Sequence, residues 1–275
     1  MKAVRIHEYE KMPFLDEVDN PKVTGPWDVI VKVGAAGLCR TDLHVIEGLW
    51  APIQNPDLRY ILGHENAGWV EEVGSAVSNV SVDDTVIMHP LVTSGLCPAC
   101  RAGQDSHCSN SRFPGLNADG GMAEFLKTNA RAVVKLDASL QPKGIAALAD
   151  AGLTAYHAVR KAAKWLFPGS YVVVIGSGGL GHIGLQSLVA LTSAHITLLI
   201  VPRRPSSLPR ASVLTKPFSR VAMKPHWIRF RRSPGAEPTL SSTLLVNKEW
   251  RRLAPECLRA GVTTMSLVAA ATSTF

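Results

Sequence analysis

Side chains that bind transition metals stand close together in the first quarter of the chain. Cys39 is followed by Thr41 and His44, and the pair His64-Glu65 comes soon after. A cysteine, a histidine and a carboxylate are zinc ligands, and a zinc ion with three protein ligands keeps one position open for a substrate. These residues therefore predict a metal site that can do chemistry.

Two further groups of metal-binding residues lie later in the sequence. The chain has five cysteines, and Cys97, Cys100 and Cys108 have the spacing of metal ligands rather than of a disulfide framework. Asp150 lies in an otherwise apolar, alanine-rich stretch. A carboxylate there is costly unless it is paired or binds a metal, so Asp150 is also a candidate ligand.

A glycine-rich turn follows the continuous apolar run at residues 171–175. The turn fits the pattern G-x-G-x-x-G, and its residues are Gly176, Gly178, Gly179, Leu180 and Gly181. With a strand before it and a helix after it, such a turn holds a dinucleotide pyrophosphate at the helix N-terminus. The acid that binds the adenosine ribose is expected about 20 residues further on. Positions 200 and 201 are isoleucine and valine, so that acid is missing.

The elements that must position these residues change character near residue 141. Before it, short apolar runs alternate with turn residues, which predicts a β domain built from strands at residues 1–6, 28–33, 67–73, 85–89, 123–127 and 132–136. After it, helical spacing at residues 145–166 precedes a buried strand at 171–175. A helix at 180–191 and a strand at 196–201 complete the opening βαβ unit of a dinucleotide-binding fold.

Charge and hydropathy exclude other classes of protein. The first 200 residues hold 16 basic and 19 acidic side chains, whereas the rest holds 13 basic and three acidic ones. The acid-rich first part argues against a nucleic-acid partner. We expect no signal peptide at residues 1–6, which have the pattern of a first strand. The apolar stretch at residues 184–201 contains too many polar residues for a membrane span. We expect a cytoplasmic protein without a membrane partner.

Four motifs resemble the zinc-dependent medium-chain alcohol dehydrogenases, and the resemblance covers residues 1–198. They are G-L-C-R-T-D-L-H, L-G-H-E-N-A-G-W-V-E-E-V-G, A-L-A-D-A-G-L-T-A-Y-H-A-V and V-I-G-S-G-G-L-G-H-I-G. The resemblance implies an α+β fold: a GroES-like β-barrel domain at residues 1–140 carries the catalytic zinc. A linking helix and the start of an α/β Rossmann domain that binds NAD follow at 141–199.

Carried over position by position, the resemblance implies a role for each candidate residue. The catalytic zinc ligands are Cys39, His64 and Asp150, with Glu65 beside the metal, and Thr41 and His44 relay the proton of the alcohol to solvent. A structural-zinc lobe spans about residues 91–112 and uses Cys97, Cys100 and Cys108. Its fourth ligand is a cysteine in the family, but Ser94 stands there in this chain.

The sequence after residue 199 departs from the family. Residues 243–250 can be coded so that a shifted reading frame gives D-F-V-G-E-Q-G-M, and residues 262–270 can give D-Y-Y-V-V-G-C-G-G. Both segments are similar to strands and turns of the family's Rossmann domain, and residues 199–201 can give V-D-R, which restores the missing acid. We interpret residues 200–275 as an irregular, out-of-frame tail that truncates the Rossmann domain. A natively disordered tail and a basic nucleic-acid-binding tail are the alternatives.

The sequence thus predicts an alcohol dehydrogenase that uses Zn²⁺ and NAD(P), with activity impaired in this truncated chain. Its substrates would be small alcohols, aldehydes or ketones, and intact family members would be homo-oligomers. Preference for NAD over NADP depends on the shifted-frame aspartate. The alternatives are an inactive frameshifted fragment, a zinc-free quinone reductase-like member of the superfamily, and a zinc- or nucleic-acid-binding protein. Cys39, His64 and Asp150 argue against a zinc-free enzyme.

Overall fold

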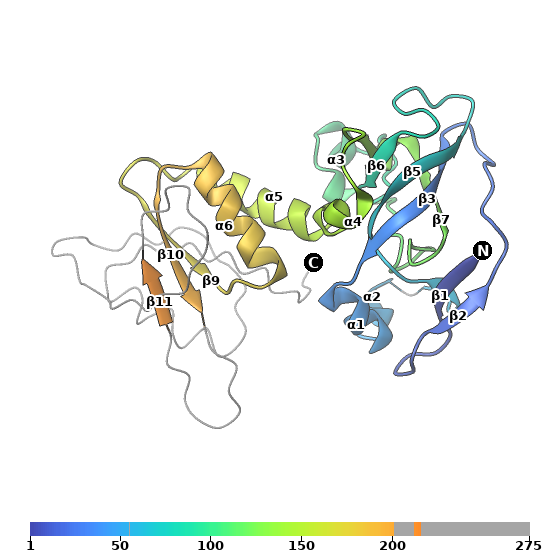
Figure 1. Cartoon of the computed structure of the whole chain (residues 1–275), viewed down its shortest axis with the longest axis horizontal. Coiled ribbons are helices and arrows are strands. Elements are labelled where there is room, and N and C mark those ends of the chain that lie inside the picture. The colour runs from blue at the N-terminus through green and yellow to red at the C-terminus, as the bar shows by residue number, and fades with distance from the viewer. Residues whose placement is uncertain (55, 201–211, 216–275) are drawn as a thin grey trace. The chain divides into compact units, whose positions relative to one another are not determined.

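The computed structural model describes residues 1–54, 56–200 and 212–215 (Figure 1). The chain divides into two compact units, the first consisting of Met1–Asp150 and the second beginning at Ala151. Apart from residue 200 and the strand at 212–215, the tail expected at residues 200–275 lies outside the described residues. In the part of the chain that is described, no helix has the length and apolar character needed to span a membrane.

A curled, five-stranded antiparallel sheet forms the centre of the first unit. Its strand order is β7-β3-β5-β6-β8, with β3 at Asp28–Gly37, β5 at Glu65–Val73, β6 at Thr85–Met88, β7 at Phe125–Asn129 and β8 at Val133–Lys135. Side chains alternate between the two faces of a strand, and Val29, Val31 and Leu126 point into a buried core with Val70 and Val86. The curled sheet agrees with the β domain expected from the sequence.

A smaller sheet and several short helices complete the first unit. The sheet has the order β2-β1-β4, with β1 at Lys2–Ile6, β2 at Phe14–Glu17 and β4 at Tyr60–Ile61. The helices are α1 at Arg40–Ile46, α2 at Ala51–Gln54 and α3 at Pro98–Arg101, with 3-10 turns η1 at Asp105–His107 and η2 at Ala130–Ala132 (Figure 1). Ile6, Val45 and Leu62 pack together in a second buried cluster, which anchors α1 beside β1 and β4.

Two β-bulges shape the pairing of β3 with β5. The register shifts between Ile30 and Val31 and again between Val33 and Ala35. A bulge bends its strand and re-aims the side chains that follow. The second bulge therefore sets the direction of the end of β3, where Gly37 pairs with Glu65 at the start of β5.

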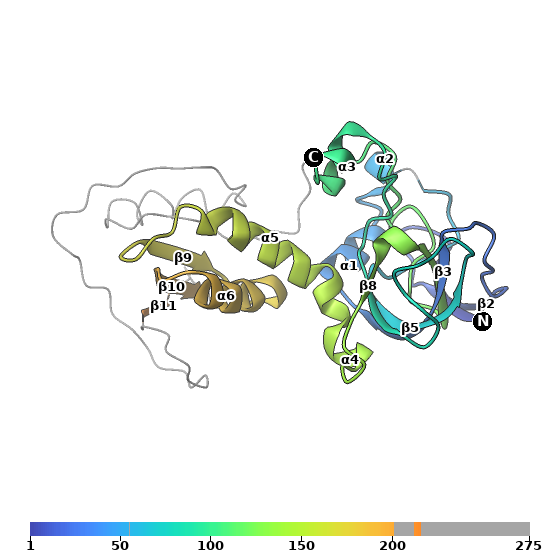
Figure 2. The same ribbon diagram turned by 90° about the horizontal axis from the view of Figure 1, so that it is seen from above.

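The second unit begins with the βαβ arrangement predicted from the glycine pattern. β9 at Tyr171–Ile175 is followed by α6 at Gly179–Leu191 and by β10 at His195–Ile200, and the two strands are parallel. A further strand, β11 at Ser212–Thr215, pairs antiparallel with β10. Figure 2 shows α6 beside α5, which spans Ala151–Ala163. Both helices contribute to one apolar core with the strands: Val159, Val172, Val174, Leu185, Leu188, Ile196 and Leu198.

The continuous helix expected at residues 145–166 is wrong. The structure has a short helix α4 at Pro142–Ile145, a 3-10 turn η3 at Ala146–Ala149, and then α5. Asp150 separates η3 from α5 with φ −122° and ψ −57°, outside the α-helical region. The apolar spacing continues across this break. Periodicity alone therefore did not reveal that the backbone leaves the helical conformation at Asp150.

Candidate functional site

The first unit brings together four of the side chains singled out by sequence. Cys39, His64, Glu65 and Asp150 each offer one ligand atom, and these four atoms all lie within 4.8 Å of one another. Cys39 lies between β3 and α1, the His-Glu pair lies at the start of β5, and Asp150 follows η3. A sulfur, an imidazole nitrogen and carboxylate oxygens at such distances can hold a transition-metal ion.

Asp42 organises this cluster although sequence reasoning gave it no role. Its Oδ2 accepts the Cys39 backbone N–H at 2.7 Å, as part of a capping box at the start of α1. Its Oδ1 lies 3.2 Å from Nδ1 of His64, and both side chains are buried. A carboxylate on one ring nitrogen fixes the imidazole so that the other nitrogen can bind a metal. The sequence signal that could have revealed this role is the position of Asp42 three residues after Cys39, which is the spacing of a capping box.

The second ring nitrogen of His64 faces the cluster. Nε2 is buried, makes no hydrogen bond to any described residue, and lies 3.5 Å from Oδ2 of Asp150. Burial lowers the pKa of His64, but its interactions with Asp150, Asp42 and Cys39 outweigh burial and raise this pKa to about 12. The proximity of His64 in turn lowers the pKa of the Cys39 thiol. A buried nitrogen without a hydrogen bond beside a thiol and two carboxylates fits a metal ion.

Glu65 is held against the backbone of β3. It is 2% exposed, and it pairs with Gly37 across the sheet. A Cβ at Gly37 would clash with Oε2 of Glu65 and would lie 2.9 Å from its Cβ. The glycine therefore leaves room for this carboxylate at the edge of the cluster.

Thr41 and His44, the expected proton relay, lie on α1. Thr41 Oγ1 is 3.7 Å from Cys39 Sγ, which places its hydroxyl beside the cluster. His44 Nε2 accepts a hydrogen bond from Arg40 Nε at 3.2 Å. No hydrogen bond joins Thr41 to His44 in the described residues.

The second cysteine cluster lies around α3 and η1 and consists of Cys97, Cys100 and Cys108, with Ser94 beside them. We call this cluster the lobe. Cys97 Sγ lies 3.5 Å from Cys100 Sγ, and Ser94 Oγ lies 3.5 Å from Cys108 Sγ and 3.9 Å from Cys100 Sγ. All three cysteines are free thiols. Hydrogen bonds from the backbone of Cys100 and Ser109 lower the pKa of Cys97 to about 6, whereas burial raises the pKa of Cys100. The structure brings Ser94 and the three thiols close together.

The glycine turn of the second unit joins β9 to α6. Gly176 has φ +86°, a left-handed conformation that favours glycine, and Gly178 caps the N-terminus of α6. A Cβ at Gly181 would clash with the Gly176 carbonyl, whereas Cβ atoms at Gly178 and Gly179 would meet nothing within 4 Å. The turn therefore packs tightly on its protein side and leaves space in front of the helix N-terminus. A helix N-terminus with open space in front of it can attract an anion.

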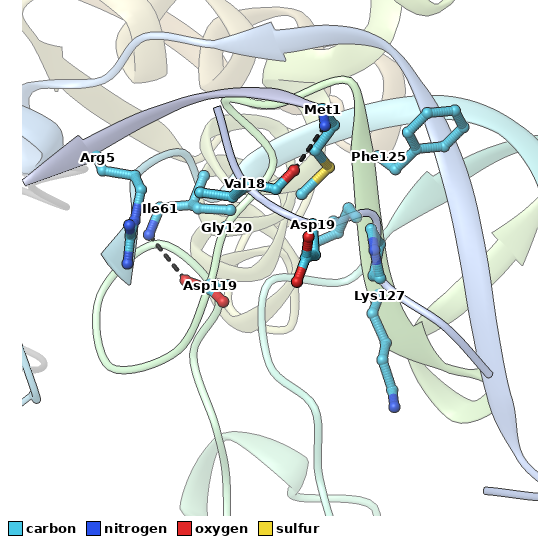
Figure 3. A pocket seen from close by; sticks show the side chains of 11 residues that line it. Met1, Arg5, Val18, Asp19, Ile61, Asp119, Gly120, Phe125 and Lys127 are labelled. Atoms are coloured by element: carbon cyan, nitrogen blue, oxygen red, sulfur yellow. Dashed lines mark hydrogen bonds between the residues drawn. The ribbon is translucent and has the colours of Figure 1, made fainter. Parts of the chain in front are cut away.

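A cavity of about 340 Å³ lies elsewhere in the first unit, and none of the four cluster residues lines it (Figure 3). The Met1 amino group donates a hydrogen bond to the Val18 carbonyl, and the Ile61 N–H donates one to Asp119. Figure 3 draws both bonds as dashed lines, and these polar groups are therefore already paired. The cavity is separate from the candidate metal centre.

Comparisons with known proteins agree with this geometry. Residues 25–138 match the alcohol dehydrogenase GroES-like domain. The crystal structure of an alcohol dehydrogenase from Aeropyrum pernix is 51% identical and superimposes with a TM-score of 0.68, covering 71% of this chain and 58% of that one. Residues 25–138 are therefore similar to the GroES-like domain of alcohol dehydrogenases.

Two other relatives bear on cofactors. An NAD-dependent alcohol dehydrogenase from Sulfolobus acidocaldarius is 38% identical over 201 residues, which are 71% of this chain and 57% of that protein. A cobalt- and zinc-bound alcohol dehydrogenase from Pyrobaculum aerophilum is 28% identical with a TM-score of 0.65, covering 74% of this chain and 60% of that one. The chain spans little more than half the length of the curated relatives it matches.

Proposed function

We propose that the chain carries the metal-binding half of a zinc-dependent alcohol dehydrogenase. The reaction is hydride transfer between a small alcohol and NAD, with an aldehyde or ketone as the other product. One observation supports this proposal above the others: the buried Nε2 of His64 has no hydrogen-bond partner in the described residues and faces Cys39 and Asp150. An apolar or hydrogen-bonded core histidine would not be arranged in this way.

Each residue of the cluster has a defined part in holding the ion. Cys39, His64 and Asp150 supply sulfur, nitrogen and oxygen ligands, and Asp42 fixes the ring of His64. Glu65 adds a buried carboxylate at the same place. Bound zinc would act as a Lewis acid that lowers the pKa of an alcohol hydroxyl. Three protein ligands leave the position that such a substrate needs.

The proton of the alcohol must leave as the hydride is transferred. The Thr41 hydroxyl lies beside Cys39, and His44 is three residues further along α1, hence on the same side of the helix. Thr41 would accept the proton from the substrate while giving up its own hydroxyl proton toward His44, and His44 would release a proton to solvent. Proton transfer through positioned side chains is general acid–base catalysis.

The glycine turn after β9 binds the cofactor pyrophosphate in this proposal. Open space at Gly178 and Gly179 lets the phosphates approach the N-terminus of α6, where free backbone N–H groups attract anions. Positions 200 and 201 carry no acid for the adenosine ribose. We therefore expect weak binding of NAD and slow turnover by this chain.

Metal analysis of the purified full chain tests the proposal. We expect zinc to co-purify, His64→Gln to lose one ion per chain, and His89→Gln to lose none, because His89 lies outside the cluster. Reduction of NAD by a primary alcohol should stop on chelation and return with Zn²⁺. A chain that reduces quinones equally well without metal would instead be the zinc-free relative.

A further inference from the structure

The lobe around α3 differs from the closed site that the family resemblance implies. A structural zinc site uses four protein ligands, usually cysteine or histidine. Here the group of possible ligands contains only Cys97, Cys100 and Cys108 among the described residues. The family's closed four-cysteine site therefore does not fit this chain.

The three sulfurs nevertheless lie at the distances of a metal site. Two sulfurs bound at about 2.3 Å to one tetrahedral ion lie roughly 3.8 Å apart. Cys97 Sγ and Cys100 Sγ are 3.5 Å apart, and Ser94 Oγ lies 3.5 Å from Cys108 Sγ and 3.9 Å from Cys100 Sγ. The lobe is thus folded as though around an ion, with a hydroxyl in place of the fourth thiol.

The segment that carries Ser94 is held in place from outside the lobe. Arg131 forms two hydrogen bonds to the Asp105 carboxylate, at 2.8 and 3.0 Å, and a third to Thr93 Oγ1 at 3.1 Å. Thr93 Oγ1 also bonds to Asp105 at 3.2 Å. These contacts fix residue 93 and engage the nearest carboxylate, so Asp105 does not replace the missing ligand.

Ser94 is a poor substitute for cysteine. Its hydroxyl is neutral at ordinary pH and can donate a hydrogen bond to a neighbouring thiolate. Zinc ligands in proteins are thiolate, imidazole and carboxylate, so the serine contributes a hydrogen bond rather than a metal bond. The position that a fourth cysteine would fill is left to a ligand from solution.

We propose that the lobe binds zinc through the three thiolates of Cys97, Cys100 and Cys108 and keeps an exchangeable fourth position beside Ser94. Such a centre takes up small ligands from solution and releases its ion faster than a closed four-thiolate site. The inference concerns the lobe alone and is independent of dehydrogenase activity.

Cobalt spectroscopy and zinc release test the proposal on the full chain. Cys39→Ala combined with Cys257→Ala serves as the background, because the three lobe cysteines are then the only cysteines left in the chain. We expect one Co²⁺ ion bound by thiolates, and we expect added imidazole to change its visible spectrum. In Ser94→Cys, added imidazole should leave the cobalt spectrum unchanged. Zinc release from this variant to a chromogenic chelator should slow at least about tenfold, since even outer-shell partners change metal affinity by about 10–100-fold.

Ser94→Ala separates a hydrogen-bonding serine from a ligating one. We expect its cobalt spectrum to show the same number of thiolates and the same response to imidazole. Faster zinc release and a changed spectrum in Ser94→Ala would show that the hydroxyl is a ligand and would overturn the proposal. A lobe that binds no Co²⁺ would overturn it as well. Circular dichroism shows whether Ser94→Cys folds. If it does not fold, the imidazole titration of the background protein, which keeps Ser94, tests the proposal by itself. A cobalt spectrum that does not respond to imidazole would contradict an open fourth position.

Discussion

Asp42 and His64 lie 22 residues apart in the sequence, and their side chains meet with Oδ1 3.2 Å from Nδ1. Asp42 is 0% exposed and His64 is 1% exposed. The contact fixes both the tautomer and the direction of the imidazole, because the carboxylate can only accept. In the neutral ring that a metal ligand requires, the proton is on Nδ1 and Nε2 is the acceptor that faces Cys39 and Asp150.

Substituting Asp42 should weaken metal binding without removing any ligand. In Asp42→Asn the side chain no longer provides a charged acceptor for His64 and for the Cys39 N–H. We expect zinc affinity to fall on the order of 10–100-fold, as for other outer-shell partners. Competition with a chelator measures the change. Asp137→Asn is the matched control, since within the described part of the chain the Asp137 side chain bonds to Ser139 on an exposed turn. Equal zinc retention in both variants would contradict the role of Asp42.

The space at Gly37 makes a second prediction. Gly37→Ala places a methyl group against Glu65, with its Cβ 2.9 Å from that of the glutamate. Because Glu65 is buried, the clash must be relieved by moving the carboxylate or the strand pair, at a cost of about 1–3 kcal/mol. We expect a lower free energy of unfolding in urea and a lower zinc affinity.

Gly144→Ala provides the comparison for Gly37→Ala. A Cβ at Gly144 meets nothing within 4 Å, and this glycine lies within α4. Alanine there should leave stability unchanged or raise it by about 0.4–1 kcal/mol, because it restricts the unfolded chain. Similar destabilisation by both substitutions would show that the effect at Gly37 does not come from Glu65.

Much of the fold followed from local sequence patterns. The run Tyr171–Ile175, the glycines after it and the helix Gly179–Leu191 appear in the structure almost as predicted, because a buried parallel strand and a glycine turn have strong local signals. The six strands expected in the first unit overlap observed strands, but β2 and β4 were not expected. β3 also extends to Gly37, beyond the expected end at residue 33. The extension depends on pairing with β5, which is a tertiary contact.

The cluster around His64 shows the limit of sequence reasoning. Residue types and family motifs singled out Cys39, His64 and Asp150, and the structure places them together. They did not reveal Asp42 as the partner of His64, since that contact joins α1 to the start of β5. The kink at Asp150 was missed for a similar reason: its apolar neighbours keep a helical period whether or not the backbone breaks.

Stability should depend on pH through Asp28. Its Oδ2 accepts the N–H groups of Thr24 and Gly25 and pairs with Lys127 Nζ at 2.9 Å. Burial raises the pKa of Asp28, but the bonds to Lys127 and to the two backbone groups outweigh it and lower this pKa to about 2. A lowered folded-state pKa contributes stability above the unfolded value of about 3.9, and the contribution is lost as pH falls toward about 2.

Asp28→Asn measures this contribution. At pH 7 we expect the variant to be less stable by about 1 kcal/mol, a value reduced for partial exposure and screening of the pair. The difference in urea unfolding free energy should shrink between about pH 4 and pH 2. Lys127→Gln should reproduce part of the loss at pH 7. A difference that stays constant down to pH 2 would show that Asp28 acts through packing rather than charge.

Two glycines of the turn after β9 should separate folding from cofactor binding. Alanine at Gly181 would clash with the carbonyl of Gly176, so Gly181→Ala should push α6 away from the turn and lower both the melting temperature and the affinity for NAD. Gly179→Ala adds a methyl group in open space at the first residue of α6. It should leave the melting temperature unchanged and weaken NAD binding alone, because the methyl group occupies the approach to the helix N-terminus. Calorimetric titration with NAD and thermal unfolding distinguish the two variants. If Gly179→Ala binds NAD as well as the original chain, the pyrophosphate does not lie at this turn.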